Sequence, residues 1–307
     1  MRARVRVPSA PLSFPPKIAS ACPGFSRPLS ATISQNPTSP EKIRRVGELL
    51  RLDSQSRLVD IACGKGGPAI VLAEAFGCRI VGVERAPEFV QVARKRIAEA
   101  GLESLIEVIE RDARDFSLEP NAFDAALCLG ASFIWDGLDG TLAALAPAVR
   151  PGGHVVVGEP FWRQWPLPDE IDPEGFTSLP GTIERFQAAG LVPMGLIAAS
   201  EDDWDRYESL HWRALEDWLA ENEDDPDADD IRGLHEEARD QYLRVRRGLL
   251  GWGMFVGRTS RTVRISAWNG VGKGSSCFPG GRPAAARAAG PSASGDEGAS
   301  PTSRAAA

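Results

Sequence analysis

Two carboxylates and a cluster of glycines have the residue types and the spacing to bind a ligand. Gly64 and Gly66 follow a short apolar run that contains Asp60, and Glu84 ends a second apolar run twenty residues after Gly64. Glycine has no Cβ, so a ligand can closely approach the backbone amides of such a turn and the start of the following helix. A carboxylate at the tip of the second strand can accept hydrogen bonds from both hydroxyls of a ribose. The pattern therefore predicts an adenosine-containing ligand.

Asp60 separates the two classes of ligand that fit this pattern. Residues 64–69 match the GxGxxA pattern of nicotinamide-dinucleotide sites. An acid four residues before Gly64 would repel a pyrophosphate, but it would attract the ammonium of an amino-acid moiety. Asp112 follows a third apolar run, where a carboxylate can accept a hydrogen bond from an adenine amino group. Asp60, Glu84 and Asp112 are thus expected at the tips of three successive strands.

In this ordered set of motifs the chain resembles the class I S-adenosylmethionine-dependent methyltransferases. The matching pieces are VDIACGKGG (59–67), VGVERA (81–86), ERDARDF (110–116), FDAALCLGA (123–131) and LAPAVRPGGHVVVGEP (145–160). The resemblance covers about residues 36–259, and within the class the chain is similar to a bacterial group of small-molecule methyltransferases with largely undefined substrates. It implies S-adenosyl-L-methionine as cofactor and methyl transfer to an N, O, S or C nucleophile of a small molecule. A nicotinamide-dependent oxidoreductase and a non-catalytic adenosine-ligand sensor are the alternatives.

The resemblance also implies which residues line the site, and no metal ligand is expected. The cofactor contacts lie at the carboxyl edge of the sheet: Asp60, Ala62, Gly64, Gly66, Glu84, Arg85, Asp112, Ala113, Leu129 and Gly130. Three residues are candidates for proton handling: Glu159 at the end of the fifth strand, and Tyr207 and His211 on the aromatic face of a later helix. Each candidate also has a structural role as an alternative to catalysis. Glu159 could form an ion pair with Arg163 or Arg185, and the aromatic face with Tyr207 and His211 could serve only for packing.

The order of apolar runs and helical patterns predicts an α/β fold. We expect a Rossmann-like, seven-stranded, mainly parallel sheet whose last strand is antiparallel, in a domain spanning residues 36–260. Two helical stretches at about residues 202–247 fall between the last two strands and are predicted to form a helical cap. The domain begins with a helix capped by Thr38 or Ser39. In the methyltransferase family that the chain resembles, this first segment closes over the cofactor. The resemblance therefore makes Asn36 and Ser39 candidate cofactor contacts.

Composition narrows the class of partner. The chain of 307 residues is 43% apolar, which supports a packed core, and its net charge of -7 argues against a nucleic-acid substrate. The acidic run at 221–230 is expected to be a solvated loop. Five dispersed cysteines without a CxxC pair favour free thiols in a reducing compartment, and no stretch has the roughly 20 apolar residues that span a bilayer. A cytoplasmic protein without a membrane partner is expected, and the sequence does not specify its oligomeric state.

The two ends of the chain have a different composition from the centre. Residues 1–35 contain no acid and many prolines and serines, and residues 261–307 are rich in glycine, proline, alanine and serine. Neither segment has enough apolar surface to offset the entropy cost of ordering, so both are expected to be disordered. An organelle-targeting segment and a misplaced start site are alternatives for the first. The glycine-rich fragment at 270–276 does not have the spacing of a phosphate-binding loop.

Overall fold

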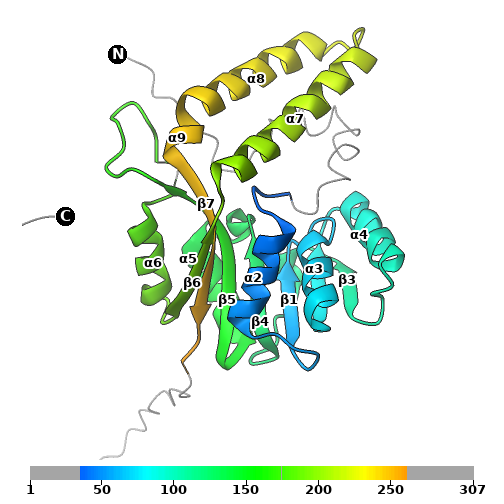
Figure 1. Cartoon of the computed structure of the whole chain (residues 1–307), viewed down its shortest axis with the longest axis vertical. Helices are drawn as coiled ribbons and strands as arrows, with labels where there is room; N and C mark the ends of the chain where they lie inside the picture. The colour runs from blue at the N-terminus through cyan, green and yellow to red at the C-terminus, as the bar shows by residue number, and fades with distance from the viewer. Residues whose placement is uncertain (1–34, 174, 261–307) are drawn as a thin grey trace, which may run out of the picture. The chain divides into compact units, whose positions relative to one another are not determined.

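The computed structural model describes residues 35–173 and 175–260. Within these residues one sheet has the strand order β3-β2-β1-β4-β5-β7-β6 (Figure 1). The strands are β1 (Arg57–Ile61), β2 (Arg79–Glu84), β3 (Ile106–Glu110), β4 (Phe123–Leu129), β5 (Val149–Trp162), β6 (Val192–Ala198) and β7 (Leu250–Arg258). All pairings are parallel except those of β7, which is antiparallel to both β5 and β6. The predicted sheet, with its antiparallel last strand, is confirmed.

The predictions for the two ends of the chain, including a targeting segment, disorder and the glycine-rich fragment, concern residues outside the described ranges. The three cysteines inside them, Cys63, Cys78 and Cys128, are buried free thiols.

Helices pack on both faces of the sheet. They are α2 (Pro40–Leu50), α3 (Gly67–Phe76), α4 (Pro87–Glu99), α5 (Leu138–Leu145), α6 (Leu179–Ala188), α7 (Glu201–Glu221), α8 (Ala228–Gln241) and α9 (Arg247–Leu249). Short 3₁₀ turns are η3 (Ala113–Asp115), η4 (Ser132–Trp135) and η5 (Ala146–Ala148), and η6 (Tyr242–Arg246) is a π turn.

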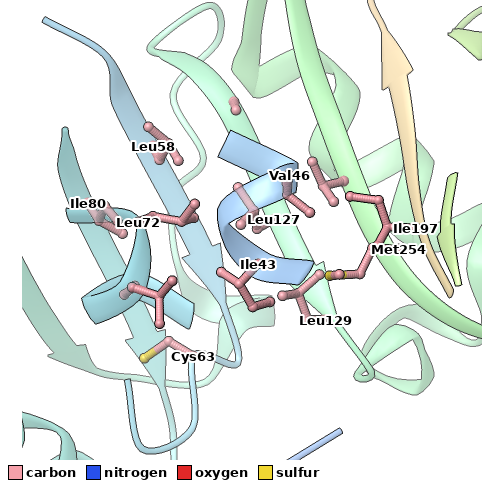
Figure 2. Packing of buried hydrophobic residues seen from close by; sticks show 14 of the residues in the cluster. Ile43, Val46, Leu58, Cys63, Leu72, Ile80, Leu127, Leu129, Ile197 and Met254 are labelled. Atoms are coloured by element: carbon pink, nitrogen blue, oxygen red, sulfur yellow. The ribbon is translucent and has the colours of Figure 1, made fainter. Parts of the chain in front are cut away.

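Two apolar clusters fill the space between helices and sheet. The first joins α2, α3 and α4 to one face, and Figure 2 shows Ile43 and Val46 of α2 packed over Leu127 of β4. The second joins α5 and α6 to the other face. Burial of each such aliphatic side chain contributes about 1.5–3 kcal/mol. The sheet is therefore fixed from both sides, and its strand tips are held at constant positions.

The helices α7 and α8 are inserted at the carboxyl edge of the sheet. Because β7 is antiparallel to both β5 and β6, strand β6 runs parallel to β5 and ends at the edge where β1 to β5 end. The chain leaves the sheet there into α7 and α8 and returns to the same edge at the start of β7. The two helices run side by side beyond the strand ends (Figure 1). The predicted insertion of helices between the last two strands is confirmed.

Capping fixes the starts of α2 and α7, and it joins the two helices. The Ser39 hydroxyl accepts a hydrogen bond from Lys42 N at 3.3 Å, and Ser200 accepts one from Asp203 N at 3.1 Å. The Asp203 carboxylate accepts from Ser200 N at 2.8 Å, which completes a capping box. Asp203 also forms an ion pair with the Lys42 ammonium. The first helix and the cap are thereby tied together.

The Pro-Gly-Gly run at residues 151–153 lies inside β5, because this strand begins at Val149. Gly152 has φ 81°, and the register with β4 shifts between Phe123 and Ala125. The glycines are thus accommodated as an irregularity within the paired strand, because a residue without a Cβ can take this backbone conformation.

Candidate functional site

The turn after β1 is built from residues with left-handed backbone conformations. Ala62, Gly64 and Gly66 have φ values of 54°, 55° and 74°. Gly64 N donates a hydrogen bond to Glu84 Oε2 at 3.0 Å, so the glycine turn and the tip of β2 are in direct contact. Gly66 is the residue before α3, whose first backbone amides have no partner within the helix. The predicted glycine turn and its acidic neighbour therefore lie together at the carboxyl edge.

The Glu84 carboxylate is held mainly by backbone amides. In addition to Gly64 N, it accepts from Arg85 N and Ala86 N, both at 2.9 Å from Oε1. A carboxylate has about four acceptor positions, so three of them are filled in this arrangement. One position on Oε2 remains open and suits a ribose hydroxyl. The amides orient the carboxylate rigidly toward the ligand side of the turn.

Asp60 is a buried carboxylate, and one of its two oxygens is unsatisfied within the part of the chain that the structure describes. Its side chain is 2% exposed, and its Oδ2 has no hydrogen-bond partner within the described part of the chain. Burial, with a smaller contribution from the negative charge of Glu84, raises the pKa of Asp60 to about 7. A second anion next to Asp60 would add charge repulsion to the cost of burying this carboxylate. A cation would offset that cost by pairing with it. The site therefore fits a ligand ammonium and not a pyrophosphate.

Asp112 lies at the tip of β3 and caps the short helix η3. It accepts from Arg114 N at 3.0 Å and from Arg114 Nη2 at 2.8 Å. These hydrogen bonds hold the pKa of Asp112 well below its usual range. Arg85, which is 68% exposed on its side chain, approaches Asp112 at 3.9 Å, and Ala113 is buried beside it. The tips of β2 and β3 thus meet, with Asp112 engaged by arginine.

The lead-in segment, residues 35–39, lies over the glycines of the site. Asn36 Nδ2 donates to the Leu129 carbonyl at 2.8 Å. A Cβ added to Gly130, which has φ 81°, would meet Asn36 Oδ1 at 2.1 Å, and one added to Gly64 would meet Gln35 Oε1 at 2.4 Å. Only glycine allows this approach at either position. Asn36 therefore lies next to the glycines of the proposed cofactor site, as expected for a candidate cofactor contact. The hydroxyl of Ser39, the other candidate, caps α2 instead.

Glu159 lies at the end of β5 but points to the face covered by α5 and α6. Side chains alternate along a strand, and Val157 and Phe161, two residues to either side, belong to the cluster beneath these helices. Glu159 is 5% exposed, Oε2 has no hydrogen-bond partner among the described residues, and burial raises its pKa to about 7. Within the described ranges neither Arg163 nor Arg185 forms an ion pair with it, because their guanidinium groups donate to backbone carbonyls instead.

Tyr207 and His211 lie on the buried side of α7, over the opposite face. His211 Nδ1 is 2.6 Å from the Tyr207 carbonyl oxygen, and the two rings are 4.3 Å apart at their centroids. Burial lowers the pKa of His211 to about 4, so the imidazole is neutral at pH 7, and burial raises the pKa of Tyr207. Tyr207 packs in the same cluster as Leu58, which shares a face with Asp60. The structure brings this pair to the Asp60 side and leaves Glu159 on the other.

Two buried charges in the cap were missed by the sequence analysis. Glu208 of α7 is 3% exposed and Arg246 of η6 is 4% exposed, with Arg246 Nη2 at 3.5 Å from Glu208 Oε1. The signal for Glu208 was present in the sequence. It follows Trp204 by four residues, so it falls on the same inward stripe of the helix, where an acid is unusual. Arg246 carried no comparable signal because it lies in a run of arginines.

Among residues 35–173 and 175–260 no group of three or more His, Cys, Asp or Glu side chains is arranged to hold a metal ion. In the same ranges no helix combines the length and the apolar character needed to cross a membrane.

The sheet order, the glycine turn and the acids at the tips of β1 and β2 define a Rossmann-like domain for an adenosine-containing ligand with an ammonium group. Residues 58–153 match a family model described as a methyltransferase domain. YjhP of Escherichia coli K12 is 31% identical over 228 residues, which are 72% of this chain and 92% of YjhP.

The fold is also similar to two crystal structures of S-adenosylmethionine-dependent methyltransferases, from Thiobacillus denitrificans and Geobacter sulfurreducens. Both proteins are in complex with S-adenosylhomocysteine. Each is 31% identical with a TM-score of 0.70, and the match covers 76% of this chain and 96% of the other. The chain belongs to the S-adenosylmethionine-dependent methyltransferase family. It is an enzyme with S-adenosylmethionine as cofactor, as the sequence predicted, and the nicotinamide alternative is wrong.

Proposed function

We propose that this methyltransferase acts in the cytoplasm on a small molecule. The small molecule lies between the carboxyl edge of the sheet and the cap formed by α7 and α8. The supporting observation is that the cap leaves and rejoins the sheet at the edge that carries Asp60. The inner side of α7 is buried and aromatic, which suits a small, partly apolar acceptor. The net charge of -7 also opposes binding of a nucleic acid.

In this proposal the cofactor is held by the strand tips and the glycine turn. Asp60 pairs with the ammonium, Glu84 accepts from the ribose, and Asp112 with Ala113 lies at the adenine. The remaining contacts come from Ala62, Gly64, Gly66, Arg85, Leu129 and Gly130. When bound, S-adenosylmethionine supplies a methyl group on a positively charged sulfur. The fixed strand tips orient this group against the acceptor, and such positioning can contribute about 7–11 kcal/mol.

The acceptor atom gives its lone pair to the methyl carbon, the electrons of the C–S bond remain on sulfur, and a proton leaves the acceptor if it carried one. Two different groups could take that proton. Glu159, with a pKa of about 7, is matched to a neutral operating pH. His211 is neutral, and donation from Nδ1 to the Tyr207 carbonyl places the lone pair on Nε2. Because these groups lie on opposite faces, we assign them as alternatives and not as one relay.

The test uses the full-length protein, methyl-labelled S-adenosylmethionine and a cell extract separated into small molecules, protein and nucleic acid. We expect label in the small-molecule fraction with the wild type, and much less at the same cofactor concentration with Asp60→Asn, the isosteric change that removes the negative charge. Label in protein or nucleic acid that depends on Asp60 would show that the acceptor class is wrong. A fluorescent fusion of the full chain, expected throughout the cytoplasm, tests the location.

A further inference from the structure

The buried pair of charges inside the cap is incompletely matched. The 3.5 Å between Arg246 Nη2 and Glu208 Oε1 exceeds the roughly 2.7–2.9 Å of a charge-assisted hydrogen bond. Arg246 Nε and Glu208 Oε1 have no hydrogen-bond partner within the described residues, although both side chains are almost fully buried. Buried charges of this kind destabilise a fold unless something else compensates them. A side-chain hydrogen bond with Trp212 supports the Glu208 carboxyl group, which leaves Arg246 Nε as the charged donor of the pair that a ligand could satisfy.

The pair lies next to the residues of the proposed acceptor site. The positive charge of Arg246 acts on the pKa of both Tyr207 and His211, and that of Lys65 in the glycine turn also acts on His211. Arg246 ends the π turn η6, a type of irregularity that is frequent at functional sites. The neutral His211 ring is thus within electrostatic range of both Lys65 and Arg246.

On this side of the sheet three buried donors have no hydrogen-bond partner among the described residues: the indole Nε1 atoms of Trp204 and Trp252, and Arg246 Nε. The acceptor atoms without a partner are Asp60 Oδ2, which is assigned to the ammonium of the cofactor, and Glu208 Oε1, while Thr38 Oγ1 can donate or accept. Trp204 and Trp252 belong to the apolar cluster that joins the cap to the sheet. Indole and guanidinium groups can only donate, so a ligand that satisfies them must bring acceptor oxygens.

We propose that Arg246 anchors an oxyanion, a carboxylate or a phosphate, on the methyl acceptor. Trp204 and Trp252 lie in the same buried region and supply further donors to this acidic group. The assignment deepens the proposed function and rests on it, because it names the substrate class of the same site.

An anionic ligand suits this site better than a cationic one. Arginine stays protonated in proteins, and its planar fork can bind a carboxylate through two parallel hydrogen bonds. Glu208 can lose its charge, because burial raises its pKa to about 7. The cap can thus keep the positive charge while the negative one is neutralised by a proton. A cationic ligand would have to displace Arg246, which has no route to neutrality.

The test is calorimetry of the full-length protein saturated with S-adenosylhomocysteine, using benzoate, phenyl phosphate, benzylamine and benzyl alcohol as probes. We expect benzoate or phenyl phosphate to bind, with the preferred one identifying the source of the oxyanion, and the amine and the alcohol to bind much more weakly. Arg246→Met should weaken binding of the preferred probe about 10- to 100-fold, and Glu208→Gln should strengthen it by removing the competing charge. Arg247→Met is the matched control, because Arg247 is half exposed and pairs with Glu201 and Asp205.

Opposite effects of the two cap variants cannot arise from loss of folding alone. Preference for benzylamine, absence of oxyanion binding up to tens of millimolar, or equal losses in Arg246→Met and Arg247→Met would overturn the assignment. Binding of S-adenosylhomocysteine is titrated in the same samples. If it persists in every variant while no oxyanion binds, the acceptor assignment fails and the cofactor site stands. If it is absent from the wild type, the proposed function itself fails.

Discussion

Binding of S-adenosylhomocysteine is expected to weaken as the pH falls below 7, because Asp60 must lose a proton to pair with the ligand ammonium. In the free protein burial raises the pKa of Asp60 to about 7. A bound cation favours the carboxylate and lowers that pKa, so binding releases a proton at any pH between the two values. The sign follows directly: affinity rises with pH up to about 7 and then levels off.

The magnitude follows from the fraction of Asp60 that is ionised before binding. A pKa of about 7 leaves roughly one carboxyl in a hundred ionised at pH 5, so the affinity at pH 5 should be about 100-fold below the plateau. This is about 2.7 kcal/mol at 1.36 kcal/mol for each pH unit. The affinity should fall again only at a still higher pH, where the α-amino group of the ligand itself loses its proton.

The assay is calorimetry at several pH values in pairs of buffers with different ionisation enthalpies, which counts the protons released. Near pH 6 the wild type should release almost one proton, and Asp60→Asn should release none while binding about 1–3 kcal/mol more weakly at pH 8. Affinity that is constant between pH 5 and 7 in a folded wild type, or an unchanged slope in Asp60→Asn, would refute the reasoning.

Three further predictions concern stability and catalysis. Burial raises the pKa values of Asp60, Glu159 and Glu208 above those of an unfolded chain, so the folded state binds more protons than the unfolded state. Without ligand the protein should therefore melt at a higher temperature at pH 6 than at pH 8 in a calorimetric scan. The opposite order of melting temperatures would contradict these pKa values. Gly130→Ala should lower the free energy of unfolding by about 1–3 kcal/mol, measured with urea, and weaken cofactor binding, because the added Cβ meets Asn36 and φ is 81°. Gly190→Ala, with φ 77° and open space, isolates the backbone strain and should leave cofactor binding intact. Glu159→Gln should lower kcat about 100- to 10,000-fold and remove the limb of the pH–rate profile near pH 7, with no change in S-adenosylhomocysteine affinity; an unaltered profile would exclude Glu159 as the base.

The sheet and its acidic tips could be predicted from sequence because both depend on local pattern. Apolar runs that end in an acid specify a strand and its tip, and parallel strands place their tips at one edge. Gly64 and Glu84 accordingly meet in the structure. What the pattern could not give is how many acceptor positions of Glu84 remain open, since neighbouring backbone amides take three of them.

The candidate catalytic residues show more clearly what the sequence alone cannot predict. Tyr207 and His211 were correctly placed on one helical face, because spacings of three and four residues determine that relation. Their separation from Glu159 depends on which face of β5 is covered by α5 and α6, and this is a property of packing. The pairing of Glu208 with Arg246 joins two elements whose contact no local spacing specifies.

The bonds between the lead-in segment and α7 have a consequence for the order of events in turnover. The segment lies over Gly64 and Gly130, and it is tied to the cap where Arg206 donates to the Thr38 carbonyl at 2.6 Å and Lys42 pairs with Asp203. Separating the segment from Gly64 and Gly130 therefore also breaks its bonds to α7. At the proposed site we expect the cofactor and the acceptor to be loaded and released in one opening step, and the rate of that step to set an upper limit on turnover.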